Sequence, residues 1–331
     1  MHDFVNTPFN IGNLQFPHRL VQGPLAGFSC APFRTLFYHY TPPAYCVSEM
    51  ISAHDVVHKH ASNSRYLLRA PAETTLCYQI AGRDPNVMAA AASRLQDLGA
   101  DLIDLNCGCP KAKIRKKGAG SALLDEIPRL MDVVVAVRAK LRIPLTVKIR
   151  LQRDERDLML AEQLEQAGVD ALIVHGRHWT DDYSVPCDAV AIAAIKQAVN
   201  IPVIANGDIA DGQSLSHMVA TGCDGFMIAR AGSGQPWLYR QLLAGIGADD
   251  ATLPQRVGAF IEHLQGLTAL ENEQQAILQS KRLVRYYFRF LQGEQLAVFY
   301  SLTSLYEVET FIHTLKFDNP PTHNNCHKIP I

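Results

Sequence analysis

Short apolar runs alternate with segments of helical periodicity through the first two thirds of the chain. Within one of those segments, Asp84 and Pro85 are typical of an N-cap and a first helical residue, and Gly99 is typical of the residue after a helix end. Regular strand–helix alternation over roughly 220 residues predicts parallel β-α-β units. We expect eight apolar runs to form strands: Leu20–Gly27, Tyr45–Met50, Thr75–Gly82, Asp101–Gly108, Pro144–Arg150, Ala171–Arg177, Pro202–Asp208 and Gly225–Arg230.

Two short motifs recur between these runs. The pattern Gly-x-Asp precedes the fourth, sixth and eighth runs, at Gly99–Asp101, Gly168–Asp170 and Gly222–Asp224. The pair Ile-Pro precedes the fifth and seventh runs, at Ile143-Pro144 and Ile201-Pro202. Two alternating kinds of unit favour a (β/α)8 TIM barrel of the α/β class over the alternative, an open doubly wound sheet.

A different pattern begins after Gly245. Residues 248–254 have the composition of a linker, and the segments that follow have helical periodicity. We expect three helices there: Gln255–Leu270, Glu273–Leu291 and Gln295–Leu315. The sequence thus predicts a barrel domain over residues 1–247, a small helical domain over 253–317, and a Pro- and Asn-rich, poorly ordered tail over 318–331.

Composition narrows the possible functions. The 331 residues include 31 basic and 32 acidic side chains, and 48% of them are hydrophobic. An apolar share of this size can build a large core, and the near-zero net charge argues against a strongly basic nucleic-acid binder while leaving room for local basic patches. The chain shows no signal peptide and no membrane-spanning run, and its cysteines are scattered. We expect a cytoplasmic protein with reduced thiols.

Polar residues stand at the ends of the predicted strands. In a TIM barrel these ends form the active-site face, and polar groups inside apolar runs are costly unless they bind something. At the ends of the seventh and eighth runs, Asn206-Gly207-Asp208 and Ala229–Gly232 predict a phosphate site. The Arg230 guanidinium would donate further hydrogen bonds to the anion. The other strand-end polar residues are Glu49, Gln79, Asn106, Lys148, Arg150, His175 and Arg177.

The fourth run ends in two cysteines, Cys107 and Cys109. No second pair follows at a suitable spacing, so we predict no metal site. Cys109 lies beyond the strand end, beside a basic loop that includes Lys113. A neutral thiol can donate a proton, whereas nearby cations favour the thiolate and a nucleophilic role, and the residues leave both roles open.

Several motifs together resemble the tRNA-dihydrouridine synthase family. The resemblance extends over residues 14–245 and is strongest at the fourth strand end. The chain departs from the family pattern at Leu25, where Met is usual, at Ala229, where Gly is common, and over His178–Tyr183. The matching motifs are Leu105–Pro110, Gly118–Leu124, Val147–Arg150, Val174–Arg177 and Ile204–Ile209.

The resemblance implies a cofactor, a reaction and site residues. NADPH would reduce FMN, and the reduced flavin would pass a hydride from N5 to C6 of a tRNA uracil while Cys109 protonates C5. It places Asn106 and Lys148 near the uracil, and Arg177 and Tyr183 at positions where the family contacts its substrate. The cofactor-binding residues that it implies are Pro24, Leu25, Gln79, Lys148, His175, Asn206, Gly207, Asp208, Ala229 and Arg230.

A basic stripe marks the predicted helix Glu273–Leu291. Lys281, Arg285 and Arg289 recur every four residues, with Arg282 beside them. Together with the loop that holds Lys113, this stripe predicts a tRNA-facing surface, in which we assign Lys113 and Arg285 as contacts. No protein partner is indicated.

Three alternatives stay open at this point. A non-redox barrel would bind a sugar phosphate and use Lys148 as a Schiff base. Another FMN barrel would reduce a small molecule. An RNA-binding barrel without catalysis would need no reactive Cys109.

Overall fold

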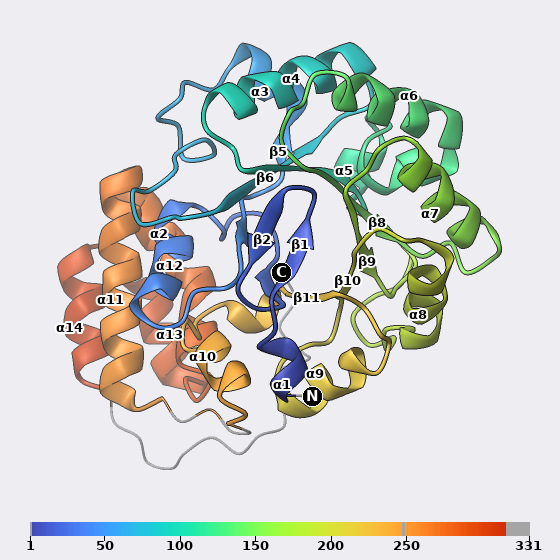
Figure 1. The fold of residues 1–331 in the computed structure, drawn as a ribbon. Coiled ribbons are helices and arrows are strands. Elements are labelled where there is room, and N and C mark those ends of the chain that lie inside the picture. Colours follow the sequence, from blue (N-terminus) through green and yellow to red (C-terminus); the bar gives the residue numbers. More distant parts are fainter. Residues whose placement is uncertain (1, 247–248, 250, 316–331) are drawn as a thin grey trace.

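Parallel strands form a closed barrel surrounded by helices (Figure 1). The computed structural model describes residues 2–246, 249 and 251–315. Around the ring the order is β4-β3-β11-β10-β9-β8-β7-β6, and pairing of β4 with β6 closes it. The strands are β3 (Leu20–Gln22), β4 (Cys46–Val47), β5 (Ile51–Ser52), β6 (Leu76–Ala81), β7 (Leu102–Cys107), β8 (Leu145–Arg150), β9 (Ala171–His175), β10 (Val203–Asn206) and β11 (Gly225–Ile228). The predicted (β/α)8 barrel is confirmed.

The helices follow the strands in the alternation that the sequence predicts. Asp84 caps α4 by accepting hydrogen bonds from the N–H groups of Asn86 and Val87, and Gly99 follows the helix with a φ of 89°. The barrel-domain helices are α1 (His2–Val5), α2 (Ala31–Thr35), α3 (Ala53–His58), α4 (Pro85–Asp97), α5 (Ala112–Arg115), α6 (Ile127–Arg138), α7 (Arg156–Gln166), α8 (Ala189–Ala198), α9 (Gly212–Val219) and α10 (Leu238–Leu243).

The second predicted strand is interrupted. Two short strands, β4 and β5, take its place, and each pairs with β6. The second of them, β5, lies beyond the predicted end at Met50. Between the two pieces, the Glu49 carboxylate turns aside to accept hydrogen bonds from the Gly27 N–H and from Arg65. A strand-end carboxylate predicted to face the active site therefore supports the loop after β3 instead.

The repeated Gly-x-Asp motif has one structural role in all three places. Each aspartate accepts a hydrogen bond, at 2.8 Å, from the backbone N–H of the first residue of the strand before it in the chain. Asp101 accepts from Leu76, Asp170 from Leu145 and Asp224 from Val203. Each also pairs with a cation, Arg69, Arg138 or Lys196 respectively. The motif therefore closes the N-terminal rim of the barrel, at the end opposite the predicted active site.

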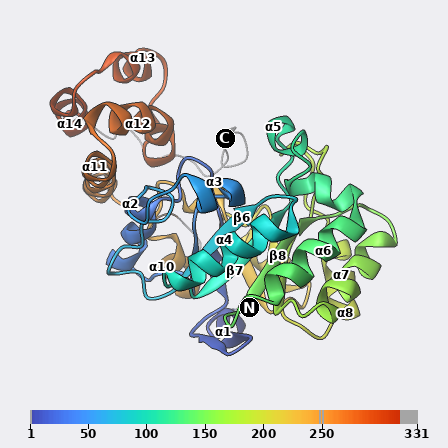
Figure 2. The same ribbon diagram turned by 90° about the horizontal axis from the view of Figure 1, so that it is seen from above.

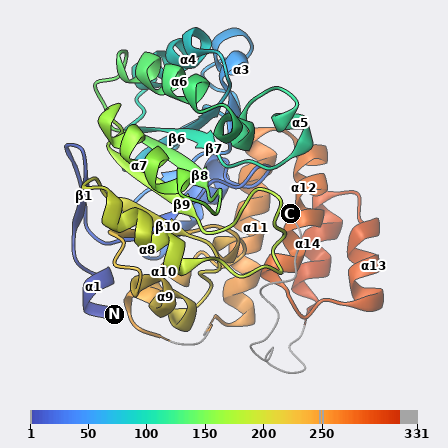
Figure 3. The same ribbon diagram turned by 90° about the vertical axis from the view of Figure 1, so that its right-hand side faces the viewer.

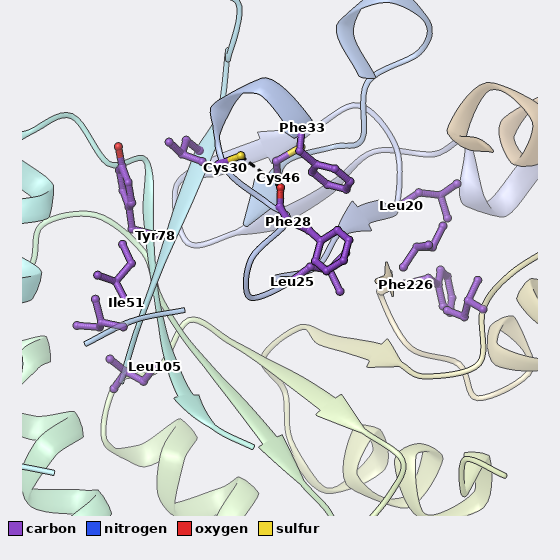
Figure 4. Packing of buried hydrophobic residues seen from close by; sticks show 14 of the residues in the cluster. Leu20, Leu25, Phe28, Cys30, Phe33, Cys46, Ile51, Tyr78, Leu105 and Phe226 are labelled. Atoms are coloured by element: carbon purple, nitrogen blue, oxygen red, sulfur yellow. Dashed lines mark hydrogen bonds between the residues drawn. The ribbon is translucent and has the colours of Figure 1, made fainter. Parts of the chain in front are cut away.

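A hairpin covers the N-terminal end of the barrel, and two clusters of buried apolar side chains form its core. The strands β1 (Phe9–Ile11) and β2 (Leu14–Phe16) lie across the N-terminal end, where Phe9 and Phe16 pack with Tyr45 (Figure 1). Figure 4 shows Leu20 of β3 beside Phe226 of β11, two residues that are partners in the strand register. The opposite, C-terminal end of the strands is left open to hold polar side chains.

The C-terminal helices form a separate layer at one side of the barrel (Figures 1 and 2). They are α11 (Leu253–Leu270), α12 (Glu273–Tyr287), α13 (Gly293–Ser301) and α14 (Leu305–His313). The prediction of one helix over Gln295–Leu315 is wrong, because Ser304 caps a new helix in a capping box with Glu307. The prediction that the second helix reaches Leu291 is also wrong, since α12 ends at Tyr287.

The helical layer contacts the barrel at points where glycine permits close approach. A side chain at Gly234, which has a φ of 69°, would come within 2.4 Å of the Tyr286 backbone. A side chain at Gly266 in α11 would meet Pro32 of α2 at 2.9 Å. The predicted tail, residues 318–331, and part of the predicted linker lie outside the described residues. Within the described chain, no helix combines the length and apolarity needed to cross a bilayer.

Candidate active site

A cavity of about 340 Å³ opens at the C-terminal ends of the barrel strands. This volume lies in the usual range for small-molecule and cofactor sites. Lys113 and Arg285 lie outside it, and every other predicted site residue lines it. The predicted residues that it brings together are Pro24, Leu25, Gln79, Asn106, Cys109, Lys148, His175, Arg177, Tyr183, Asn206, Gly207, Asp208, Ala229 and Arg230.

The backbone of Cys109 is held from both sides. Its N–H donates to Asn106 Oδ1 at 2.9 Å, and its carbonyl accepts from Ser121 Oγ at 3.0 Å and from the Ser121 N–H at 3.1 Å. Gly120, with a φ of 64°, lies so close that a side chain there would contact the Cys109 carbonyl at 2.8 Å. The thiol is therefore presented by a rigid loop, although Cys109 itself is partly exposed.

The same loop is tied to the loop that follows β9. Arg115 in α5 donates to Ser121 Oγ at 3.0 Å and to Asp125 at 2.7 Å. Its guanidinium also stacks on the Trp179 ring, with 3.6 Å between the guanidinium carbon and the ring centroid. Arg115, which no sequence pattern separates from its basic neighbours, thus links the loops that follow β7 and β9.

Beneath the thiol lies a row of buried polar side chains. Asn106 Nδ2 donates to Gln79 Oε1 at 2.8 Å, and Gln79 Nε2 donates to Asp104 Oδ2 at 2.7 Å. Thr146 Oγ1 donates to the other carboxylate oxygen at 2.6 Å. Burial raises the pKa of Asp104, against the lowering effects of Thr146, Gln79 and Lys148.

Cations gather along the adjoining strand ends, from β8 to β11. Lys148 Nζ donates to Asn206 Oδ1 at 2.8 Å, and burial, followed by repulsion from Arg150, lowers the pKa of Lys148 to about 8. Burial lowers the pKa of His175 far below its ordinary value, and Lys148 and nearby arginines add to the effect. His175 is therefore neutral, and the wall is poised for an anionic ligand.

Arg177 and Asp208 are engaged with each other. Arg177 donates to both Asp208 oxygens, at 2.7 and 2.8 Å, and its Nε donates to the Val185 carbonyl at 2.6 Å. Asp208 also accepts from the Cys187 N–H at 2.9 Å. These bonds hold the loop after β9 against the loop after β10, and the substrate role assigned to Arg177 stays a prediction.

Arg230 lies at the predicted phosphate site. Its Nη1 atom is buried and has no hydrogen-bond partner among the described residues. One face of its guanidinium is covered by the Tyr183 ring, 3.6 Å from the guanidinium carbon to the ring centroid. At Gly207, any side chain would collide with Cys187 Sγ, so the loop after β10 requires glycine. A buried hydrogen-bond donor that has no acceptor from the described residues is the arrangement expected of an anion site.

The helical domain supplies two lining residues that the sequence did not reveal. Tyr286 and Arg289, at and just beyond the end of α12, line the cavity. The prediction of one basic stripe through Arg289 is wrong, because α12 stops before it and Arg289 turns toward the cavity. Met50 was also missed, since it lies in the segment between β4 and β5.

The two predicted RNA contacts outside the cavity are both exposed. Lys113 belongs to α5 and Arg285 to α12. Figures 2 and 3 show these two helices toward the same end of the molecule, away from α1. Their position fits a surface around the cavity mouth. Among the described residues, no group of three or more His, Cys, Asp or Glu side chains is arranged to hold a metal ion.

Comparison with known proteins decides the family. The model of the dihydrouridine synthase family matches residues 20–307. The chain belongs to the dihydrouridine synthase family. It is 38% identical over 292 residues to tRNA-dihydrouridine synthase B of Pseudomonas aeruginosa, covering 86% of this chain and 87% of that protein. It is 35% identical over 314 residues to tRNA-dihydrouridine synthase B of Shewanella oneidensis, covering 89% and 97%.

This dihydrouridine synthase also shares its fold with more distant proteins. Morphinone reductase superimposes with a TM-score of 0.54 at 14% identity, over 76% of this chain and 92% of that one. That likeness concerns the barrel alone. The predicted family, barrel fold and oxidoreductase class of the enzyme are confirmed.

Proposed function

We propose that this dihydrouridine synthase reduces the C5–C6 double bond of specific uridines in tRNA, with FMN as cofactor and NADPH as reductant. One observation carries the proposal: a single cavity brings Cys109 and Asn106, from the end of β7, together with the cations at the ends of β8, β9 and β11. The family match supports the same reaction, and the substrate named for the relatives is tRNA.

The residues present fit FMN. The buried Arg230 Nη1 offers an unused donor for the phosphate, and Gly207 keeps the neighbouring loop free of side chains. Lys148 would place a cation beside the flavin ring, and neutral His175 can donate one hydrogen bond without adding charge. Reduced FMN would supply the hydride that adds to C6 of the uracil.

Cys109 completes the reduction. Its Sγ–H bond breaks and the proton goes to C5, so that the uracil gains one hydride and one proton. The thiolate then regains its proton from water. The bonds from Asn106 and Ser121 hold the Cys109 backbone in place throughout, so the thiol needs no loop movement to reach its position.

The tRNA must present its base to the cavity. A uracil in a folded loop leaves its stack to reach a site inside the barrel, where Asn106, which lines the cavity, would bond its polar edge. Lys113 on α5 and Arg285 on α12 would contact phosphates around the cavity mouth. In this assignment Arg177 and Tyr183 border the base or the flavin from the loop after β9.

One anaerobic experiment tests the proposal. The purified protein is reduced with NADPH, excess reductant is removed, unmodified tRNA is added, and the oxidised flavin band is followed. We expect the band to return only with that tRNA, and dihydrouridine to appear in it. A flavin that stays reduced would favour reduction of a small molecule, and a protein without flavin would favour the sugar-phosphate alternative.

A further inference from the structure

Asp104 lies one layer below Cys109 in the barrel and is completely buried. It stands on β7 between Gln79 of β6 and Thr146 of β8, its direct partners in the strand register. Two residues further along β7, Asn106 is the register partner of Lys148. The three strands therefore place one carboxylate, two amides and one hydroxyl side by side under the catalytic loop.

The side chains of Asp104, Gln79 and Asn106 form a hydrogen-bonded row in which every donor points toward Asp104. An ionised carboxylate only accepts, so Gln79 must turn its NH2 group toward Asp104, at 2.7 Å. That leaves Gln79 Oε1 to accept from Asn106 Nδ2, at 2.8 Å. Asn106 Oδ1 is then left to accept from the N–H groups of Gly108 and Cys109, at 3.2 and 2.9 Å.

We propose that Asp104 is a positioning residue of the reaction: its carboxylate holds the Gln79 amide in the one orientation that the Asn106 amide can meet, and thereby supports the placement of Cys109. This inference rests on the proposed function for its consequence, because Cys109 is the proton donor there. The row is fixed at both ends. The N–H groups of Gly108 and Cys109 can only donate, so they require Asn106 Oδ1, and the ionised Asp104 can only accept, so it requires the Gln79 NH2 group.

Thr146 makes the inference testable with nearly isosteric changes. In Asp104→Asn, the new amide can still accept from Gln79 if its NH2 group points to the Thr146 hydroxyl. In Thr146→Val, Asp104 loses one bond but remains acceptor-only toward Gln79. In the double variant the NH2 group of the new amide has no partner, and a reversed row would turn the Asn106 NH2 group toward the N–H groups of Gly108 and Cys109, so neither arrangement satisfies the whole row.

The measurement is the single-turnover rate of the FMN-loaded enzyme with unmodified tRNA, together with the KM for tRNA. Each single variant should slow the reaction by less than about threefold, whereas the double variant should slow it by about 10²-fold with an unchanged KM, since small misplacements of reacting groups can cost that much. Asp104→Leu should match the double variant. A double variant no slower than the product of its two parents would overturn the proposal.

A second readout does not depend on the reaction. The rate at which iodoacetamide alkylates Cys109, followed by peptide mass spectrometry, should change in the double variant and stay near the wild-type rate in both single variants. Identical alkylation rates in all four proteins would contradict the proposal even if none of them reduced tRNA. Failure of the wild-type protein to form dihydrouridine, with alkylation changed as expected, would instead remove only the proposed function.

Discussion

The two sides of the cavity are organised in opposite ways. On the thiol side, Cys109, Asn106 and Gln79 have their hydrogen bonds satisfied by neighbours, so that wall is complete without a ligand. On the cationic side, burial and repulsion from Arg150 disfavour the charge of Lys148, and the buried Nη1 of Arg230 has no hydrogen-bond partner among the described residues. The comparison teaches that one wall is preorganised by the protein, whereas the other keeps donors available for an anionic ligand.

The strongest test of this difference removes the thiol. We expect Cys109→Ala to slow dihydrouridine formation by about 10²- to 10⁴-fold, the usual worth of a general acid, while the FMN content stays unchanged. Single-turnover mixing with unmodified tRNA and the flavin absorbance give the two quantities. Dihydrouridine formed at the wild-type rate would show that another group protonates C5.

The converse change acts on the cationic wall. Arg230→Met should weaken FMN binding by about 10- to 100-fold, because hydrogen bonds to charged groups contribute about 1.5–3 kcal/mol each. Fluorescence titration of the flavin-free protein measures the affinity. Lys113→Met, outside the cavity, serves as the matched control and should bind FMN normally; equal losses in both variants would mean that the phosphate lies elsewhere.

A smaller effect should come from pH. The pKa of Lys148 is lowered to about 8 in the protein, so Lys148 is charged below that value and neutral above it. An anionic ligand favours the charged form, so FMN binding should take up a proton and weaken by up to about tenfold per pH unit above pH 8. Affinity measured between pH 7 and 9.5 tests this. The slope should vanish in Lys148→Met, and a slope that persists there would assign the proton to another group.

The smallest expected effect concerns cations outside the cavity. Arg285→Glu should weaken tRNA binding and reduce the slope of its salt dependence by about one, the contribution of one phosphate contact. Arg142→Glu is the control, because Arg142 is exposed in the turn before β8, at the far end of the barrel. If both variants keep the wild-type slope, α12 does not face the RNA.

The barrel could be predicted from the sequence because its signals are local and repeated. The capping residue Asp84 and the Gly-x-Asp motifs mark element boundaries wherever they occur, and each does so in the structure. The split at Ser304 could also have been predicted, since Ser304 and Glu307 have the spacing of a capping box. The continuous apolar periodicity through that region concealed it.

The site was predictable where polar residues lie in the C-terminal halves of the strands. Gln79, Asn106 and Lys148 were found because barrel strands deliver their ends to one face. Asp104, the register partner of Gln79, was missed because Asn106, closer to the end of the same strand, already supplies a polar residue to that strand end. Tyr286 and Arg289 were missed because their place in the cavity depends on how the helical layer packs against the barrel, which no local pattern encodes.

The contact of Tyr286 with Gly234 bears on how the enzyme is made. The loop after β11 lies against the backbone at the end of α12, and Tyr286 and Arg289 form part of the cavity wall. During synthesis the barrel strands leave the ribosome first, and these two residues follow only after the whole barrel. The nascent barrel therefore carries Cys109 in a chamber that still lacks one wall, and the chamber is completed only when the helical layer docks.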